Sequence, residues 1–177
     1  TQEKPAIVLS LMSVPMASLT LMPGAYVASR ALADTQPLVG AGLADGGFGL
    51  MTSIRLIDPD AQSAPMTLLF FSEQVSIGSE GAAPSITDQN AMNYLGHVNV
   101  TAGHWQLLGG SSVATVACRI GVQAEVGSRD IFVAAINGTN APTFPGGVIY
   151  MQATVEPVSP PATTPAPTLL GPELVVN

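Results

Sequence analysis

Two aspartates, Asp58 and Asp60, flank Pro59 in the stretch LIDPDAQSAP and form the one close pair of acids that could serve as reactive carboxylates. Such a pair can act as acid and base, or can bind a divalent cation. A helix-loop-helix calcium site needs further oxygen ligands and a late Glu, which this stretch lacks. The following Gln62 and Ser63 are typical of a turn at the end of a strand. We therefore interpret the stretch as a β-hairpin turn, with a structural cation or catalysis as alternatives.

Other residues with reactive side chains also lack a supporting pattern. His97 and His104 are seven residues apart, without a neighbouring Cys or acid, and match no common zinc spacing. The glycine-rich segment 40–49 precedes a predicted strand and has no nearby Lys, so it indicates a turn or bulge instead of a phosphate loop. The sequence around Ser111 and Ser112 lacks the second glycine of a nucleophile elbow. The sequence predicts no catalytic, cofactor-binding or metal-binding residue.

Three aromatic residues and one cysteine each allow two interpretations, one structural and one functional. Trp105 beside a glycine-rich turn indicates an anchor in the core or at a sheet edge. The alternative is a sugar-binding platform in which Trp105, Tyr94 and Tyr150 stack on sugar rings. Cys118 is the only cysteine, which excludes an internal disulfide. We interpret it as a small buried hydrophobic residue and not as a reactive thiol.

The elements that must position these residues are mostly strands. Apolar and polar residues alternate with a period of two, and 18 Gly and 15 Pro interrupt the pattern at short intervals. This predicts an all-β antiparallel sandwich, jelly-roll or Greek-key like. The one short helix is expected within 86–96, with Thr87 or Asp88 as its N-cap. The predicted strands are 24–30, 50–58, 65–73, 95–101, 112–126, 130–136 and 147–155.

Alternation also predicts which side chains form the core. In the strand 50–58, the even-numbered residues form one face and the odd-numbered residues form the other. We assign the even-numbered face to the interior. The predicted core residues are Leu50, Ile54, Leu56, Leu68, Phe70, Ile131, Val133 and Ile149.

The composition divides the chain into a central domain, 24–156, and two extended arms. The first arm, 1–23, contains the apolar run 6–22, which two prolines and several Ser and Thr residues interrupt. It lacks the preceding basic region of a signal peptide, so we interpret it as an apolar arm or strand that packs on protein and infer no membrane segment.

The second arm, 157–177, is rich in proline and is predicted to be extended. Six of the 15 prolines follow Val155, and that segment has no aromatic or basic residue. It cannot bury enough apolar area to fold alone, so we expect it to dock on a neighbouring chain. Among its apolar residues, we predict that Leu169, Leu170, Val175 and Val176 bind that partner.

The charge balance excludes one class of partner. Five Lys and Arg against twelve Asp and Glu give a formal net charge of -7. Nucleic-acid binding needs clustered cations that release counterions from phosphates, so nucleic acid is an unsuitable partner. Only 10% of the residues are charged and 47% are hydrophobic, which indicates a surface that is partly covered by another protein.

Three segments carry a resemblance to a known group of proteins: GGFGLMTSIRLIDPDAQSAPMTLLFFSE (46–73), ITDQNAMNYLGHVNVT (86–101) and SSVATVACRIGVQAEVGSRDIFVAAINGTNAPTFPGGVIYMQATVEP (111–157). Together they resemble small virion proteins of tailed bacteriophages, of the kind that decorate or cement the capsid. The similarity spans residues 24–157. It rests on a glycine-led strand that ends in an Asp, a partner strand that ends in aromatic residues, and the Thr-Asp step at Thr87.

The resemblance implies a non-enzymatic β-sandwich without cofactors. Such a protein binds the outside of the major capsid protein shell, often as a homo-trimer, and is located on the capsid surface of a virion assembled in the host cytoplasm. The alternative from a different class is a carbohydrate-binding or host-attachment sandwich of a tail or fibre.

Overall fold

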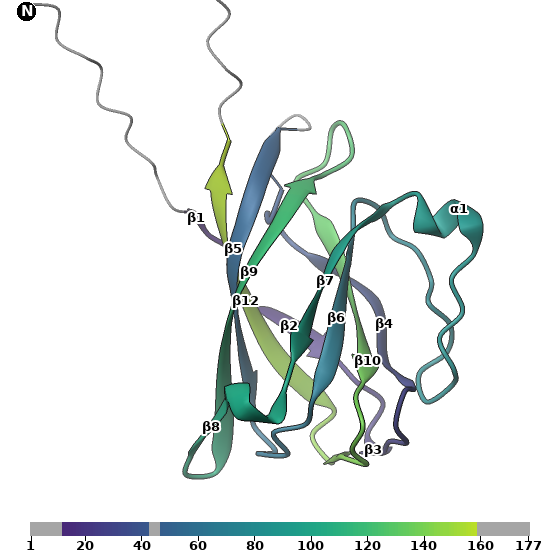
Figure 1. Ribbon diagram of the computed structural model, residues 1–177, viewed down its shortest axis with the longest axis vertical. Coiled ribbons are helices and arrows are strands. Elements are labelled where there is room, and N and C mark those ends of the chain that lie inside the picture. Colours follow the sequence, from purple (N-terminus) through teal and green to yellow (C-terminus); the bar gives the residue numbers. More distant parts are fainter. Residues whose placement is uncertain (1–11, 43–46, 159–177) are drawn as a thin grey trace, which may run out of the picture.

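A computed structural model describes residues 12–42 and 47–158 and shows two antiparallel sheets packed face to face (Figure 1). The six-stranded sheet has the order β1-β12-β5-β9-β8, with β2 also paired to β12, and the four-stranded sheet has the order β4-β10-β6-β7. A small third ladder joins β11 to β3. The strands are β1 (Met12–Ser13), β2 (Ala17–Thr20), β3 (Gly24–Ala25), β4 (Ala31–Leu38), β5 (Phe48–Asp58), β6 (Met66–Phe71), β7 (Tyr94–Val100), β8 (Trp105–Leu108), β9 (Ser111–Gln123), β10 (Ile131–Asn137), β11 (Thr143–Phe144) and β12 (Val148–Pro157).

The pairing of the strands is that of a jelly roll. Apart from the short strands β1 and β8, the strands of the two sheets are, in chain order, β2, β4, β5, β6, β7, β9, β10 and β12. The first pairs with the last, the second with the seventh, the third with the sixth and the fourth with the fifth. These four pairs are the ones expected when a long antiparallel hairpin folds over into two sheets, which is how a jelly roll is built. The predicted all-β sandwich is thus confirmed.

The prediction of a strand at 24–30 was wrong. Only Gly24–Ala25 is a strand there, the chain turns at Ser29 with φ 59, and the long strand follows as β4. The sequence of β4, ALADTQPL, contains Asp34 and Pro37, which are disfavoured in strands. Pro37 is tolerated because β4 is the edge strand of its sheet. The short strand β8 was also missed.

Residues 12–23, which the sequence assigned to an N-terminal arm or strand, contribute strands to the sandwich. β1 and β2 both pair with β12, and Val14, Leu19 and Leu21 are buried in the main core. Residues 1–11 lie outside the described residues. So do the predicted partner-binding residues Leu169, Leu170, Val175 and Val176.

The main core lies between the two sheets, and a bulge changes which residues of β5 enter it. All the predicted core residues are buried except Leu50, which is half-buried on the outer face, while Met51 is fully buried instead. The register of β5 against β12 shifts at Thr52, where Met51 pairs with Val155 but Ser53 pairs with Thr154. One extra residue reverses the alternation of a strand. Ile54 and Met51 therefore share the inner face, and the prediction for Leu50 was wrong.

A second apolar cluster lies on the outer face of the four-stranded sheet. It includes Leu69, Phe71 and Ala134 from the sheet, with Val75 and Ile77 from the long β6–β7 connection. This connection, residues 72–93, lies over the sheet and contains α1 (Asp88–Ala91) (Figure 1). The Thr87 hydroxyl caps α1 by accepting a hydrogen bond from the Asn90 N–H at 3.2 Å, as predicted. The outer face of this sheet is thus covered by the chain itself.

Candidate interaction surfaces

The buried carboxylate of Asp58 organises a corner between the two sheets. Asp58 is 0% exposed and accepts hydrogen bonds from the backbone N–H groups of Asp60 and Ser63, each at 3.0 Å. The Ser112 hydroxyl lies 3.5 Å from the same carboxylate. Because β5 and β6 belong to different sheets, this segment is not the turn of a hairpin, and that prediction was wrong. Asp58 instead fixes a crossover in which Ala61 and Ser63 adopt positive φ angles of 52° and 50°.

Asp60 holds a different loop. Its carboxylate accepts a hydrogen bond from the Gly146 N–H at 3.0 Å, and the neighbouring Gln62 side chain accepts one from the Thr143 N–H at 3.1 Å. Both aspartates thus act as acceptors for backbone groups. Among residues 12–42 and 47–158, no group of three or more His, Cys, Asp or Glu side chains could hold a metal ion. The corner therefore has a structural role.

The two histidines also occupy separate local structures. His97 Nδ1 lies 2.6 Å from the Tyr94 hydroxyl, and the two rings stack with centroids 6.4 Å apart. His104 Nδ1 accepts a hydrogen bond from the Thr101 N–H at 3.0 Å within the capping box of the short 3-10 helix η2 (Ala102–His104). Each imidazole thus interacts with a residue three positions earlier in its own strand or turn.

The aromatic residues proposed for sugar binding are not brought together. Trp105 is half-buried, its indole N–H donates to the Ala64 carbonyl at 3.0 Å, and its cross-strand partner Ala114 is fully buried. It is the predicted anchor at a sheet edge. Tyr150 points outward from the six-stranded sheet, and Tyr94 lies in the four-stranded sheet. They do not form a common platform.

An apolar pocket lies beneath α1. Its volume is about 300 Å³, and Phe71 and Tyr94 pack edge to face within it with centroids 5.8 Å apart. Partial burial raises the pKa of Tyr94. The sequence did not predict this pocket, because it exists only where residues 72–93 fold back over the sheet. Its lining residues are Leu69, Phe71, Ile86, Ala91 and Tyr94.

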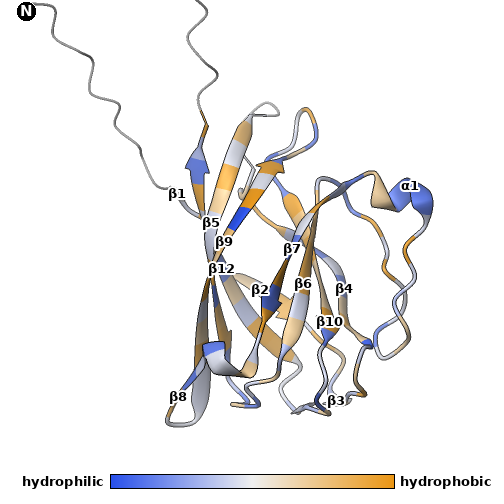
Figure 2. Cartoon of the chain, viewed as in Figure 1, coloured by the Kyte–Doolittle hydropathy of each residue, from blue (hydrophilic) through white to orange (hydrophobic). Residues whose placement is uncertain are grey.

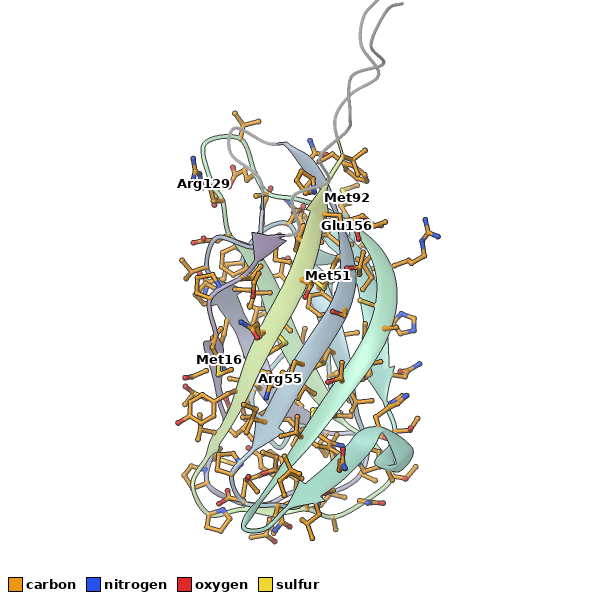
Figure 3. All side chains as sticks on the ribbon, turned by 90° about the vertical axis from the view of Figure 1, so that its left-hand side faces the viewer. Met16, Met51, Arg55, Met92, Arg129 and Glu156 are labelled. Atoms are coloured by element: carbon orange, nitrogen blue, oxygen red, sulfur yellow. The ribbon has the colours of Figure 1, made fainter. Side chains whose placement is uncertain are left out.

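The outer face of the six-stranded sheet is exposed and poor in charge (Figure 3), and we call it the open face. Arg55 and Arg119 project from its central strands, and Glu156 lies near the end of β12. In Figure 2 these strands are mostly pale or orange, whereas α1 is blue. The other outward residues are small, polar or apolar, and they include Phe48, Leu50, Ser53, Ile57, Val113, Thr115, Ala117, Tyr150, Gln152 and Thr154.

A hairpin formed by β8 and β9 exposes two adjacent leucines. Among the described strands β8 pairs only with β9, and the turn passes through Gly109 at a φ of 69°. Leu107 is 63% exposed and Leu108 is 56% exposed. We call residues 105–112 the leucine hairpin. It lies at the end of the sandwich opposite to α1 (Figure 1).

Cys118 packs against the main core from β9. Its thiol is half-buried and lies 3.5 Å from the Met51 carbonyl. Burial raises the pKa of Cys118 to about 11. The interpretation of Cys118 as a core-packing residue agrees with this position.

We expect Cys118 to react with an aromatic disulfide reagent roughly 100-fold more slowly in the folded protein than in urea at pH 8, because only the thiolate attacks. The rate in the folded protein should increase as the pH rises toward 11. Absorbance of the released thiol measures both rates. Equal rates in the folded and unfolded states would contradict the assigned burial.

Comparison with known proteins finds structural similarity but no sequence match. No protein-family model matches the chain, and no curated protein sequence matches it. A chain in the single-particle structure of maize chlorotic mottle virus is similar with 14% identity and a TM-score of 0.26, over 88% of this chain and 97% of that chain. In the described part of the chain, no helix is long and apolar enough to cross a membrane. The jelly roll is identified by the strand pairing of this chain itself.

Proposed function

We propose that this protein is a non-enzymatic structural protein of a virus particle, a decoration or cement protein that binds the outside of the major capsid protein shell. The observation that carries this proposal is the leucine hairpin. Two adjacent leucines that are more than half exposed contribute little to the stability of an isolated chain. They can stabilise an assembly when a partner covers them.

The remaining side chains favour a structural role over an enzymatic one. Asp58, Asp60, His97 and His104, which could do chemistry, each bond to neighbouring protein groups. Jelly rolls of this strand pairing build viral capsid domains and lectin domains. The scattered positions of Trp105, Tyr94 and Tyr150 give the lectin alternative no binding platform.

The charge favours the outside of a shell over its inside. A protein that packages a genome needs a cluster of cations to neutralise phosphates. The formal net charge of this chain is -7, and its five Lys and Arg residues are scattered. A protein on the outer surface of the particle does not need to contact nucleic acid.

The leucine hairpin has the properties of an anchor. Full burial of a leucine side chain contributes about 1.5–3 kcal/mol, so two leucines supply a contact that is weak in one copy. Many copies on one shell, or a trimer that binds three equivalent sites, would bind far more tightly because each contact raises the effective concentration of the next. The predicted C-terminal anchors, such as Leu169 and Leu170, would add to the same attachment.

The test is the double substitution Leu107→Ser with Leu108→Ser. We expect it to reduce the amount of protein that sediments with purified shells at least about tenfold, which corresponds to about 1.4 kcal/mol, while the isolated protein keeps its melting temperature. Val126→Ser is the matched control, because Val126 is 86% exposed on a different loop. Binding unchanged by the double substitution, or equally reduced by the control, would contradict the proposed role of the hairpin.

A further inference from the structure

The outer surfaces of the two sheets differ in charge. The open face carries the cations Arg55 and Arg119 on its central strands. The opposite side of the sandwich is covered by residues 72–93, which contain Glu73, Glu80 and Asp88 and no Lys or Arg. We call residues 72–93 the acidic cover.

We propose that two copies of this chain associate head to tail, with the open face of one copy against the acidic cover of the next. The partner of the open face is thus a second copy of the same protein. This inference does not depend on whether the protein binds a shell.

The open face is suited to such a contact because no segment within residues 12–42 and 47–158 covers it. The other sheet has its own apolar cluster beneath the acidic cover, but β5, β9 and β12 have no equivalent covering segment among the described residues. Arg55 lies between the uncharged Gln152 and Thr115 on the neighbouring strands. In Figure 3 Glu156 lies near the end of β12, away from Arg55. The Arg55 guanidinium is therefore available to a carboxylate of another molecule, and Arg119 is likewise exposed.

The acidic cover is held in a defined position on its sheet. Asp34 of the edge strand β4 accepts hydrogen bonds from the Ser76 hydroxyl and the Ile77 N–H, each at 2.8 Å. The buried Thr35 hydroxyl donates to the Val75 carbonyl. Burial, and then the nearby charge of Asp34, raise the pKa of Glu80. Glu80 of the acidic cover thus lies near Asp34, and hydrogen bonds hold residues 75–77 against β4.

The acidic cover also exposes apolar side chains. Met92 is 85% exposed and Ile86 is 39% exposed, and the adjacent Tyr94 of β7, beside the same apolar pocket, is also 39% exposed. The open face offers Tyr150, which is 37% exposed, and the half-buried Ile57 and Val113. Each surface thus combines apolar area with charge of one sign, and the two signs are complementary. Apolar contact would supply area, while the charges would fix orientation.

Charge complementarity favours a head-to-tail contact over a two-fold contact. In a two-fold contact each surface meets its own copy, which would place Arg against Arg or acid against acid. Contact between different surfaces repeats from copy to copy, and it closes into a ring when the rotation permits. A trimer of the proposed cement protein would be one such ring.

The experiment uses the full chain and measures its association by sedimentation at low and high salt. We expect wild-type protein to associate at about 0.05 M salt, and more weakly at about 0.5 M, where surface charges are screened. Arg55→Glu with Arg119→Glu should weaken association at least about tenfold, and Glu73→Arg with Asp88→Arg should do the same. All four residues are exposed, so both variants should keep their fold. Combining the four substitutions in one chain should restore association, because both surfaces then change sign.

Arg129→Glu is the control, because Arg129 is exposed on a loop outside the open face. It should associate like the wild type. A wild-type protein that stays monomeric, or a folded four-substitution variant that fails to associate, would overturn the inference. A monomer that still binds shells through the leucine hairpin would overturn it while supporting the proposed function, so the two failures are distinguishable.

Discussion

Replacing Asp58 with Ala is expected to lower the free energy of unfolding by about 2–4 kcal/mol, although the side chain takes part in no proposed contact with a partner. The Asp58 carboxylate is the acceptor for the N–H groups of Asp60 and Ser63 in a buried corner. Hydrogen bonds to a charged group contribute about 1.5–3 kcal/mol, and donors left unpaired in the interior cost more than donors that water can reach. Urea denaturation measures the difference.

The comparison variant is Asp60→Ala, because Asp60 is only partly buried and has one backbone donor, Gly146, in another loop. Asp60→Ala should lower the free energy of unfolding by less than about 1.5 kcal/mol. A chelator should leave the melting temperature of the wild-type protein unchanged. A fall of about 10 °C in chelator would contradict the corner described here and would indicate a bound structural cation.

Truncating Met51 to Ala is expected to lower the free energy of unfolding by about 2–5 kcal/mol. The neighbouring Leu50→Ala should lower it by less than about 1.5 kcal/mol. Met51 is fully buried between Val155 and Ile120 on the adjacent strands, so its removal leaves a cavity. Leu50 is half-buried on the outer face. Chemical denaturation of both variants tests the position of the bulge directly. If Leu50→Ala destabilises the protein more than Met51→Ala, then β5 alternates regularly and has no register shift at Thr52.

The bulge in β5 determines which of its residues face the core and which face the proposed interface. Without the extra residue at Thr52, the segment before it would turn its other face outward. The bulge keeps Met51 in the core and Leu50 at the open face, while Ile54 and Arg55 keep the orientation that regular alternation predicts. One inserted residue therefore sets which side chains a second copy of the chain can reach.

Local sequence determined the class of fold, most strand positions and the small helix. Alternation with a period of two acts within one strand, so it located β6, β7, β10 and β12 to within about two residues at each end, and correctly assigned Ile54 and Phe70 to the core. Helix capping acts over three residues, so Thr87 was identified as an N-cap candidate. The low content of Lys and Arg predicts that nucleic acid is not a partner, and this stays a prediction.

Only the tertiary structure decided which sheet each strand joins, and most features of the candidate surfaces follow from that. The connection after Asp58 was read as a hairpin because turn chemistry is the same whether the next strand pairs with the previous one or crosses to another sheet. The register shift at Thr52 depends on β12, about a hundred residues later, and no local pattern reports it. The pocket beneath α1 and the separate charges of the open face and the acidic cover likewise arise from residues far apart in sequence. Their positions are fixed by long-range pairing, because a strand specifies its own two faces but not the neighbours that cover them.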